Sequence, residues 1–373
     1  MHPANRLTRK SSKIRIHSFL FNNANPPHTL SPEQPARFPA ALERKNQKVP
    51  PLWLMRQAGR YLPEYRALRA QSESFLHFCY TPEWAIEATM QPIRRFGFDA
   101  SIIFSDILTI PDALRRNVRF TTGEGPEMDP ITDPAVITSL RSTYDPSILA
   151  PVYEAVKGVR GALPKQTALI GFCGAPWTVA TYMIAGKGSK DQAQARLFAY
   201  RHPQAFQLLL DLLVEVSTTH LVAQLDAGAD TLQIFDSWAG VLPPREFERW
   251  CVQPVQALVA KVRTLRPGTR IIGFPRGTTT EGYLRFASET KIDAISIDTA
   301  ADLAAVAALK DMPVLQGNLD PLVLVVGGDG LDRAIDDILA VASGRPYIFN
   351  LGHGILPETP IAHVEHLLRR VRG

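Results

Sequence analysis

The chain has 373 residues, 45% of them apolar, which is enough to bury a core in one large domain or two smaller ones. Its 41 Lys and Arg residues exceed its 36 Asp and Glu residues, giving a net charge of +5. Residues 1–32 hold five basic residues and no acidic one, so the remaining residues are balanced in charge. This excludes the broad positive field that binds nucleic acid, and any anion must be recognised by individually placed arginines.

The first 36 residues are set apart from the fold. They lack the continuous apolar core and the small-residue cleavage site of a secretory signal. An organelle transit peptide, a disordered extension and a start codon assigned too far upstream are the three alternatives. We treat residues 1–36 as a disordered or non-native extension and residues 37–373 as one domain.

The cysteines and the apolar runs indicate the cellular compartment in which the protein is expected. Cys79, Cys173 and Cys251 are odd in number and widely spaced, unlike a disulfide framework or a CxxC pair. No apolar run approaches the ~18 residues of a membrane span. We therefore expect a soluble, cytoplasmic protein without a membrane span and without nucleic acid as a partner.

Short, nearly continuous apolar runs recur along the chain, as expected for parallel strands covered on both faces. The predicted strands are residues 50–55, 99–104, 167–172, 230–235, 270–274, 293–298, 312–317 and 347–352. Amphipathic segments, often opened by Pro or an acidic residue, separate them. The predicted helices are residues 82–96, 146–159, 203–228, 244–265, 280–288, 301–309, 331–343 and 358–371, and residues 115–134 are predicted to form a hairpin and loop.

Eight strands that alternate with eight helices predict an α/β protein with a single (β/α)8 TIM-type barrel. A doubly wound parallel sheet is the alternative, because a strand count does not prove closure. In a barrel the active site lies at the carboxyl ends of the strands. The polar residues at these ends are Arg56, Arg60, Ser105, Asp106, Tyr182, Asp236, Ser237, Arg276, Asp298, Asn318, Asp320 and His353.

Each of these residues also has a structural interpretation. The arginines can be solvated surface charges, Asp106 a turn cap, Tyr182 a packing residue, Ser237 a turn residue and His353 a structural hydrogen-bonding group. Together at one mouth, however, they predict a site for a polyanionic ligand, because guanidinium forks match carboxylates. The motifs of phosphate loops, dinucleotide folds, zinc proteases and serine hydrolases are incomplete or missing.

Two stretches, WLMRQAGRYLPEYR and GFCGAPWTVATYMIAGK, resemble the signatures of the uroporphyrinogen decarboxylase family. IIFSDIL, QIFDSWAG, LQGNLDP and NLGHGI resemble its other strand-end segments, in the same order. The resemblance covers residues 37–373. It implies a (β/α)8 barrel, a homodimer, no cofactor and no metal. The implied reaction is the decarboxylation of the four acetate side chains of uroporphyrinogen III to give coproporphyrinogen III in haem and chlorophyll synthesis.

The resemblance also implies the site residues. Substrate binding is implied for Arg56, Gln57, Ala58, Gly59, Arg60, Arg69, Asp106, Tyr182, Ser237 and His353. Arg56 and Arg60 are expected to bind carboxylates, and Asp106 to accept the pyrrole N–H groups. Arg66, by contrast, keeps only a structural role on the following helical turn.

The implied chemistry accounts for the expected absence of a cofactor. Protonation of the pyrrole beside the acetate-bearing carbon makes the ring its own electron sink. Asp106 then stabilises the ring cation more than the neutral ring, which lowers the barrier. Arg56 and a held water are the candidate proton donors, although a guanidinium is a poor acid. The predicted catalytic residues are therefore Asp106 and Arg56.

Two other functions fit the same barrel. The first is a methyltransferase related to the corrinoid-dependent enzymes, whose zinc site uses a His-x-Cys element; here the corresponding stretch is His353, Gly354 and Ile355, without a cysteine. The second is a non-catalytic carrier of tetrapyrroles or anions.

Overall fold

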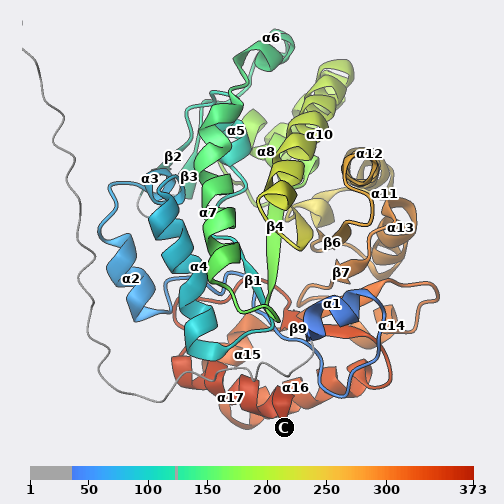
Figure 1. Cartoon of the computed structure of the whole chain (residues 1–373). Helices are drawn as coiled ribbons and strands as arrows, with labels where there is room; N and C mark the ends of the chain where they lie inside the picture. The colour runs from blue at the N-terminus through green and yellow to red at the C-terminus, as the bar shows by residue number, and fades with distance from the viewer. Residues whose placement is uncertain (1–35, 122–124) are drawn as a thin grey trace, which may run out of the picture.

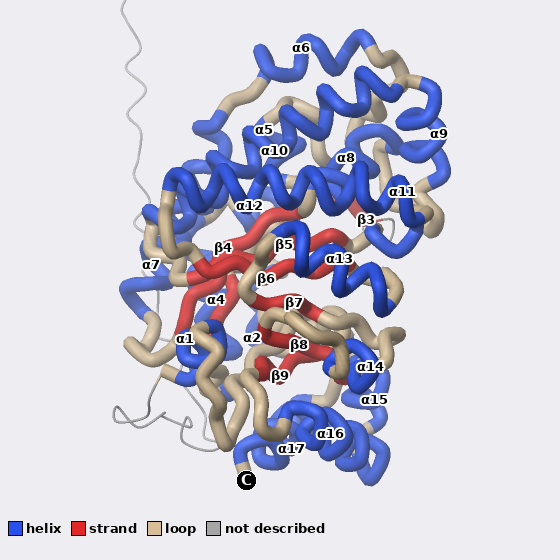
Figure 2. Tube along the Cα trace, turned by 90° about the vertical axis from the view of Figure 1, so that its right-hand side faces the viewer, coloured by secondary structure: helices blue, strands red, loops and turns tan. Residues whose placement is uncertain are grey.

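The computed structural model describes residues 36–121 and 125–373, so nearly all of the predicted extension at residues 1–36 lies outside the described residues. Seven parallel strands form a curved sheet in the order β1-β4-β5-β6-β7-β8-β9, with helices around it (Figures 1 and 2). The strands are β1 (Ala100–Ile102), β4 (Ala168–Gly174), β5 (Thr231–Asp236), β6 (Arg270–Pro275), β7 (Ala294–Ser296), β8 (Val314–Leu319) and β9 (Tyr347–Leu351). They match seven of the eight predicted strands.

The eighth predicted strand, residues 50–55, is not a full strand. It makes one parallel bridge, between Leu52 and Phe349 of β9. A regular ladder is not possible there because Pro50 and Pro51 have no N–H to donate. On the other side, the carbonyl of Leu52 accepts the N–H of Asp99 at 2.9 Å, directly before β1. The segment therefore joins β9 to β1 and closes the barrel, which excludes the doubly wound sheet.

The carboxylate of Asp99 stabilises this seam. It accepts the N–H of Leu52 at 2.9 Å and forms ion pairs with Arg37 at 3.2 Å and Arg372 at 3.6 Å. The two arginines lie on α1 (Arg37–Leu42) and α17 (Ile361–Arg372). One buried carboxylate thus ties the first and last helices to the closing segment.

The predicted helices are present with shifted ends. They are α4 (Pro82–Phe96), η1 (Pro146–Leu149) continued by α7 (Ala150–Ala162), α10 (Pro203–Asp226), the continuous run α11 (Pro244–Glu246), η3 (Phe247–Val252) and α12 (Gln253–Leu265), α13 (Thr280–Thr290), α14 (Leu303–Ala307), α16 (Gly328–Ala342) and α17. The helices that were not predicted are α1, α2 (Pro63–Arg69), α3 (Phe75–Cys79), α5 (Thr109–Ala113), α6 (Ala135–Thr143), α8 (Pro176–Ala185), α9 (Ala193–Arg201), η2 (Ala239–Val241) and α15 (Pro321–Val326). The predicted hairpin is an antiparallel pair of β2 (Arg119–Thr121) and β3 (Gly125–Glu127).

Apolar side chains fill the amino-terminal end of the barrel. Phe38 and Leu42 of α1 pack against inward-facing residues such as Ile170 and Ile348, all of them buried. Helix α1 therefore closes this end of the barrel, and the site has to lie at the other end.

A layer of hydrogen-bonded polar side chains lies above this apolar plug. Gln316 donates to Ser296 at 2.6 Å and to Gln233 at 3.2 Å, and it accepts from the indole N–H of Trp53 at 2.9 Å. These four side chains come from β5, β7, β8 and the closing segment, and all are buried. The mutual hydrogen bonds make a buried polar layer tolerable and fix the register of the strands around it.

Helix α10 is long and apolar enough to cross a membrane by length and composition alone. Most of its apolar window, 61%, is buried inside the protein, where α10 packs against β4, α8 and α12. This burial is typical of a core helix in a barrel.

Candidate active site

Arg56 lies where the closing segment ends, in the left-handed backbone region with φ of 63°. This conformation costs roughly 1 kcal/mol or more for a residue other than glycine, so the surrounding contacts must hold it. The N–H of Met55 donates to the side chain of Asn350 on β9 at 2.9 Å. The aliphatic part of Arg56 lies against Gly354, where an added Cβ would be 2.3 Å from Cδ of the arginine. The loops at β9 therefore fix both the backbone and the side chain of Arg56.

The four residues that follow Arg56 differ in burial. Gln57 is fully buried; its amide donates to the carbonyl of Ala100 at 3.2 Å, and its oxygen accepts the N–H of Leu54 at 3.2 Å. Arg60 is exposed, and Ala58 and Gly59 are half-buried. The side chain of Gln57 thus fixes the turn that presents its neighbours.

Asp106 follows β1 and uses one oxygen in a turn. Oδ1 accepts the N–H of Leu108 at 2.8 Å, while Oδ2 makes no hydrogen bond to any described residue. Burial raises the pKa of Asp106 to about 6, against the opposing effects of the Leu108 N–H and the charge of Arg56. The turn-cap interpretation is confirmed for Oδ1, and the ligand-binding role of Asp106, for which Oδ2 is free, stays a prediction.

The charge of Arg56 reaches three predicted site residues that belong to separate segments. Burial is the largest cause of the pKa shifts of Asp106, of Tyr182 on α8, and of His353 after β9. The charge of Arg56 is a smaller cause in all three and lowers each pKa. Electrostatic effects of this kind require proximity. The structure therefore brings Arg56, Asp106, Tyr182 and His353 together at one mouth, as the barrel rule predicts.

His353 lies half-buried with its Nδ1 buried and without a hydrogen-bond partner among the described residues. Burial, followed by the charges of Arg56 and Arg276, lowers the pKa of His353 to about 4, while the charge of Asp298 acts in the opposite direction. The imidazole is therefore neutral at physiological pH and can exchange a hydrogen bond with a ligand.

Tyr182 and Ser237 occupy the β4 and β5 sides of the mouth. Burial raises the pKa of Tyr182, so the residue is a neutral phenol. Ser237 is half-buried directly after β5, and its neighbour Trp238 donates its backbone N–H to Thr178 at 3.2 Å. Thr178 in turn donates to Asp236 at 2.5 Å, which fixes the backbone that carries Ser237.

The two arginines of α2 have different surroundings. Arg66 donates to the carbonyls of Arg60 at 2.7 Å and Tyr61 at 3.3 Å, so it has the structural role expected for it. The guanidinium of Arg69 donates to the carbonyl of Ser72 at 3.0 Å and lies 6.0 Å from the ring centre of Phe75. Arg69 is thus partly engaged by the protein itself.

Three other strand-end residues are structural. Asp298 accepts from Tyr283 at 2.8 Å, from the N–H of Ala300 at 2.8 Å and from the N–H of Gly277. Asn318 donates to the carbonyl of Asp298 at 3.1 Å. Asp320 caps α15 through the N–H of Leu322 at 2.9 Å. These groups connect the loops and leave ligand contacts to others.

An aromatic cluster beneath the mouth was not predicted. Phe172, Phe235 and Phe274 come from β4, β5 and β6, and their ring centres are 5.6 Å and 6.3 Å apart in that order. They lie on the inward face with Gln233, as the strand register shows. Phe172 and Phe274 are buried, and Phe235 is half-buried. The apolar strand runs contain these residues, but the sequence does not reveal which of them face into the barrel.

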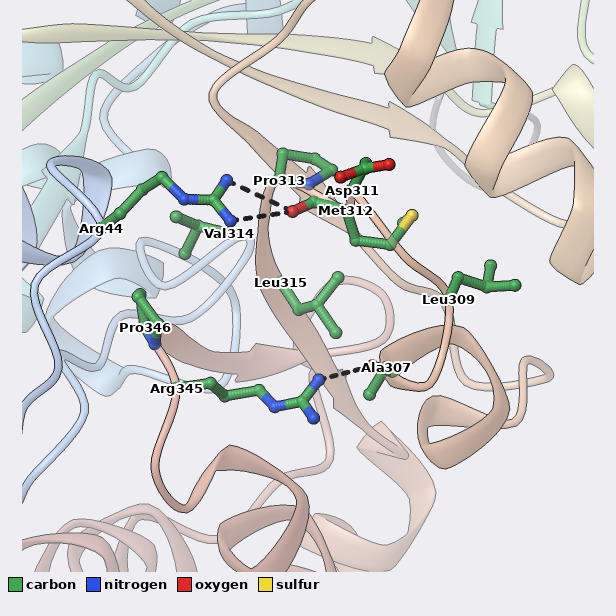
Figure 3. Close-up of a pocket in the computed structure, with 10 residues that line it drawn as sticks. All are labelled: Arg44, Ala307, Leu309, Asp311, Met312, Pro313, Val314, Leu315, Arg345 and Pro346. Carbon is green, nitrogen blue, oxygen red and sulfur yellow. Dashed lines mark hydrogen bonds between the residues drawn. The ribbon is translucent and has the colours of Figure 1, made fainter.

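A hollow of about 190 Å³ lies at the amino-terminal ends of β8 and β9, away from this mouth (Figure 3). Arg44 donates to the carbonyl of Met312 and Arg345 to the carbonyl of Ala307. Both arginine side chains therefore hydrogen-bond to backbone carbonyls that line the hollow. Within residues 36–121 and 125–373, no three His, Cys, Asp or Glu side chains gather in a way that could hold a metal ion.

These features define a (β/α)8-barrel protein whose mouth combines unpaired arginines, a half-buried carboxylate and an aromatic cluster, which suits a large, flat polyanion. The sequence model of the family described as uroporphyrinogen decarboxylase (URO-D) matches residues 33–373. A uroporphyrinogen decarboxylase from Sinorhizobium fredii is 58% identical over 89% of this chain and 96% of its own. One from Sphingopyxis alaskensis is 52% identical over 91% and 98%. The chain belongs to the uroporphyrinogen decarboxylase family.

Among solved structures, a methyltransferase from Methanosarcina mazei superposes with a TM-score of 0.73 over 90% of this chain and 97% of its own. The two sequences are 18% identical, so this similarity concerns the fold.

Proposed function

We propose that this protein decarboxylates the four acetate side chains of uroporphyrinogen III to methyl groups, giving coproporphyrinogen III. The observation that carries the proposal is the position of Arg56: its side chain lies against Gly354, next to His353, and its charge lowers the pKa of Asp106. A guanidinium, which suits carboxylates, is thus near a half-buried carboxylate that can face pyrrole N–H groups. The family membership and the names of relatives that are 52–58% identical support the same reaction.

Arg56 and Arg60 bind carboxylates of the substrate in this proposal. Neither guanidinium has a carboxylate or carbonyl partner among the described residues, whereas Arg94, Arg95 and Arg370 all pair with acidic side chains. Unpaired arginines at one mouth are suited to an octacarboxylate, since each can form a bidentate, charge-assisted pair.

Asp106 is the catalytic carboxylate in the proposal. With a pKa of about 6 it is ionised at neutral pH, and its free Oδ2 can accept N–H bonds from the pyrrole rings. Protonation of a ring carbon creates a cation, which a desolvated carboxylate stabilises more strongly than it stabilises the neutral ring. The neutral pyrrole faces pack on Phe235, the half-buried member of the aromatic cluster. The ring thus supplies the electron sink, and the proposal requires neither a cofactor nor a metal.

Tyr182, Ser237 and His353 orient the substrate by hydrogen bonds, and Arg69 contributes positive charge from α2. Gln57, Ala58 and Gly59 shape the turn between the two arginines. These roles are predictions from the family resemblance, supported by the positions of the residues at the mouth.

Two rival functions use the same fold. A zinc-dependent methyltransferase of this superfamily would use a cysteine in a His-x-Cys element, and Ile355 occupies that position here. A carrier of tetrapyrroles would bind the same ligand without turnover. Metal analysis of the purified protein tests the first rival, and product analysis tests the second.

The homodimer and the cytoplasmic location remain predictions. Light scattering of the purified protein measures the first, and fractionation of the source cells measures the second.

The experiment for the proposal itself is incubation of the protein with uroporphyrinogen III under reducing conditions, with and without a chelator. Chromatography of the oxidised porphyrins then gives the number of carboxylates. Conversion of the eight-carboxylate porphyrin to the four-carboxylate porphyrin, unaffected by the chelator, supports the proposal. Binding without conversion supports the carrier.

A further inference from the structure

The backbone of Arg276, one residue past β6, is held from both sides. Its N–H donates to the carbonyl of Asp236 at 3.0 Å, and its carbonyl accepts the N–H of Gly240 at 2.9 Å. The next residue, Gly277, donates its N–H to the carboxylate of Asp298. The close approach of the loops requires glycine, because a Cβ at Gly240 would lie 2.3 Å from the carbonyl oxygen of Gly277. The loops after β5, β6 and β7 thus place Arg276 at the mouth.

The guanidinium of Arg276 has no hydrogen-bond or ion-pair partner in the part of the chain that the structure describes, although the residue is half-buried. Other arginines of this region are paired: Arg263 and Arg270 both bind Asp293, at 2.7 Å and 2.9 Å. Asp298, which shares the surroundings of Arg276, is already occupied by three donors. A partly desolvated guanidinium without an ion-pair partner is costly, and an anionic ligand would reduce that cost.

Arg276 and Arg56 act on the same histidine. Burial is the largest cause of the lowered pKa of His353, and the charges of these two arginines are the second and third causes. His353 therefore lies within electrostatic reach of both arginines, and its buried Nδ1 has no partner among the described residues. Two cations around a neutral imidazole form a second anion-binding corner, on the β6 side of the mouth.

We propose that Arg276, together with His353, binds a peripheral carboxylate of the substrate as a further binding residue of this active site. The proposal rests on the proposed function, whose substrate carries eight carboxylates, more than Arg56 and Arg60 can pair with. Arg276 contributes to affinity and to the orientation of the macrocycle. The electron sink remains the ring over Asp106.

The test compares Arg276→Gln and Arg276→Lys with wild type in the decarboxylation assay. We expect Arg276→Gln to raise KM for uroporphyrinogen about tenfold or more, with a change in kcat below about threefold, since uniform binding is lost. Arg276→Lys keeps the charge without the fork and should give an intermediate KM. Arg333→Gln is the matched control, because Arg333 is exposed on α16 and its loss removes the same charge away from the mouth.

A second readout separates binding from structure. NMR titration of His353 should show a higher imidazole pKa in Arg276→Gln, and thermal unfolding should show a Tm near that of wild type. An unchanged KM in both Arg276 variants overturns the assignment. If wild type binds uroporphyrin without turnover, the proposed function fails. The Kd values of Arg276→Gln and wild type for uroporphyrin still test the role of Arg276 in that case. A ratio of the two Kd values near one rejects this role.

Discussion

The side chain of Arg56 lies directly against Gly354, and a Cβ at position 354 would be 2.3 Å from Cδ of the arginine. The backbone of Gly354 is outside the left-handed region, so alanine can adopt its conformation. The contact partner is a flexible side chain, which can move. The absence of a side chain at Gly354 therefore leaves room for the Arg56 side chain and is not required by the backbone conformation.

Gly354→Ala should displace the Arg56 side chain and lower kcat/KM for uroporphyrinogen about tenfold or more, with Tm nearly unchanged. Gly352→Ala is the matched comparison, because its Cβ would lie 2.3 Å from the backbone nitrogen of Thr299. That clash involves backbone and should cost about 1–3 kcal/mol of unfolding free energy. Steady-state kinetics and thermal unfolding of both variants check this. Full activity in Gly354→Ala would show that Arg56 does not need its present position.

Arg56→Gly should be more stable than Arg56→Ala by roughly 0.5–1 kcal/mol, although both lose the guanidinium. Glycine adopts the φ of 63° without strain, whereas alanine keeps the penalty. Urea unfolding of the two variants measures the difference. Equal stabilities would mean that the backbone relaxes away from the left-handed region when the arginine is removed.

Asp106→Asn should stabilise the protein at pH 7.5 by up to about 3 kcal/mol while abolishing most turnover. The pKa of Asp106 is about 6 in the folded protein and 3.8 as an ordinary aspartate, so the folded state holds the proton more tightly. Ionisation therefore destabilises the fold: the cost grows as pH rises from 3.8 to about 6 and stays constant above. Asparagine avoids this cost and keeps an oxygen for the Leu108 N–H. Unfolding free energies of variant and wild type should converge near pH 4.

Asp133→Asn is the control for this measurement. Asp133 is exposed and caps the N–H of Ala135 at 2.9 Å in the same kind of turn. It should change stability by less than about 0.5 kcal/mol at either pH. If Asp106→Asn behaves in the same way, the carboxylate of Asp106 is not desolvated in the folded protein.

Ligand binding should raise the pKa of His353 from about 4. The carboxylates of a bound porphyrin offset the charges of Arg56 and Arg276, two of the groups that lower this pKa after burial. NMR titration with and without coproporphyrin measures the shift. His220 is an internal reference: burial lowers its pKa to about 4 as well, and its Nδ1 lies 3.1 Å from the hydroxyl of Tyr153, away from the mouth. A shift at His220 and not at His353 would contradict the placement of His353.

The sequence predicted the barrel because each buried strand is a short apolar run, a pattern set by burial on both faces. Pro50 and Pro51, which limit residues 50–55 to a single bridge, are visible in the sequence, but we predicted a full strand there. The role of Asp99 in the seam could not be predicted, since it depends on Arg37 and Arg372, which are distant in sequence. Helix α8 was missed because it is buried on nearly all sides and lacks a helical period of polar residues.

The sequence predicted that the candidate site lies at the strand ends. It did not predict which polar residues there hold the loops together and which are left free for a ligand. Asp298 and Asn318 lie at or near the carboxyl ends of their strands, as Asp106 and Arg276 do, yet they bind backbone groups of the neighbouring loops. Gln57 belongs to the first signature but is turned into the barrel wall. Which polar group is already paired is a property of contacts between distant segments, and no pattern along the chain reveals it.

The most direct test of catalysis by Asp106 is a side-by-side time course of wild type and Asp106→Asn with uroporphyrinogen III, followed by chromatography of the oxidised porphyrins. Wild type should pass through seven-, six- and five-carboxylate porphyrins to the four-carboxylate product. The folded Asp106→Asn variant should bind the substrate and leave nearly all of it with eight carboxylates. Equal rates in the two proteins, or an unchanged substrate with wild type, would contradict the catalytic role of Asp106 or the decarboxylase activity, respectively.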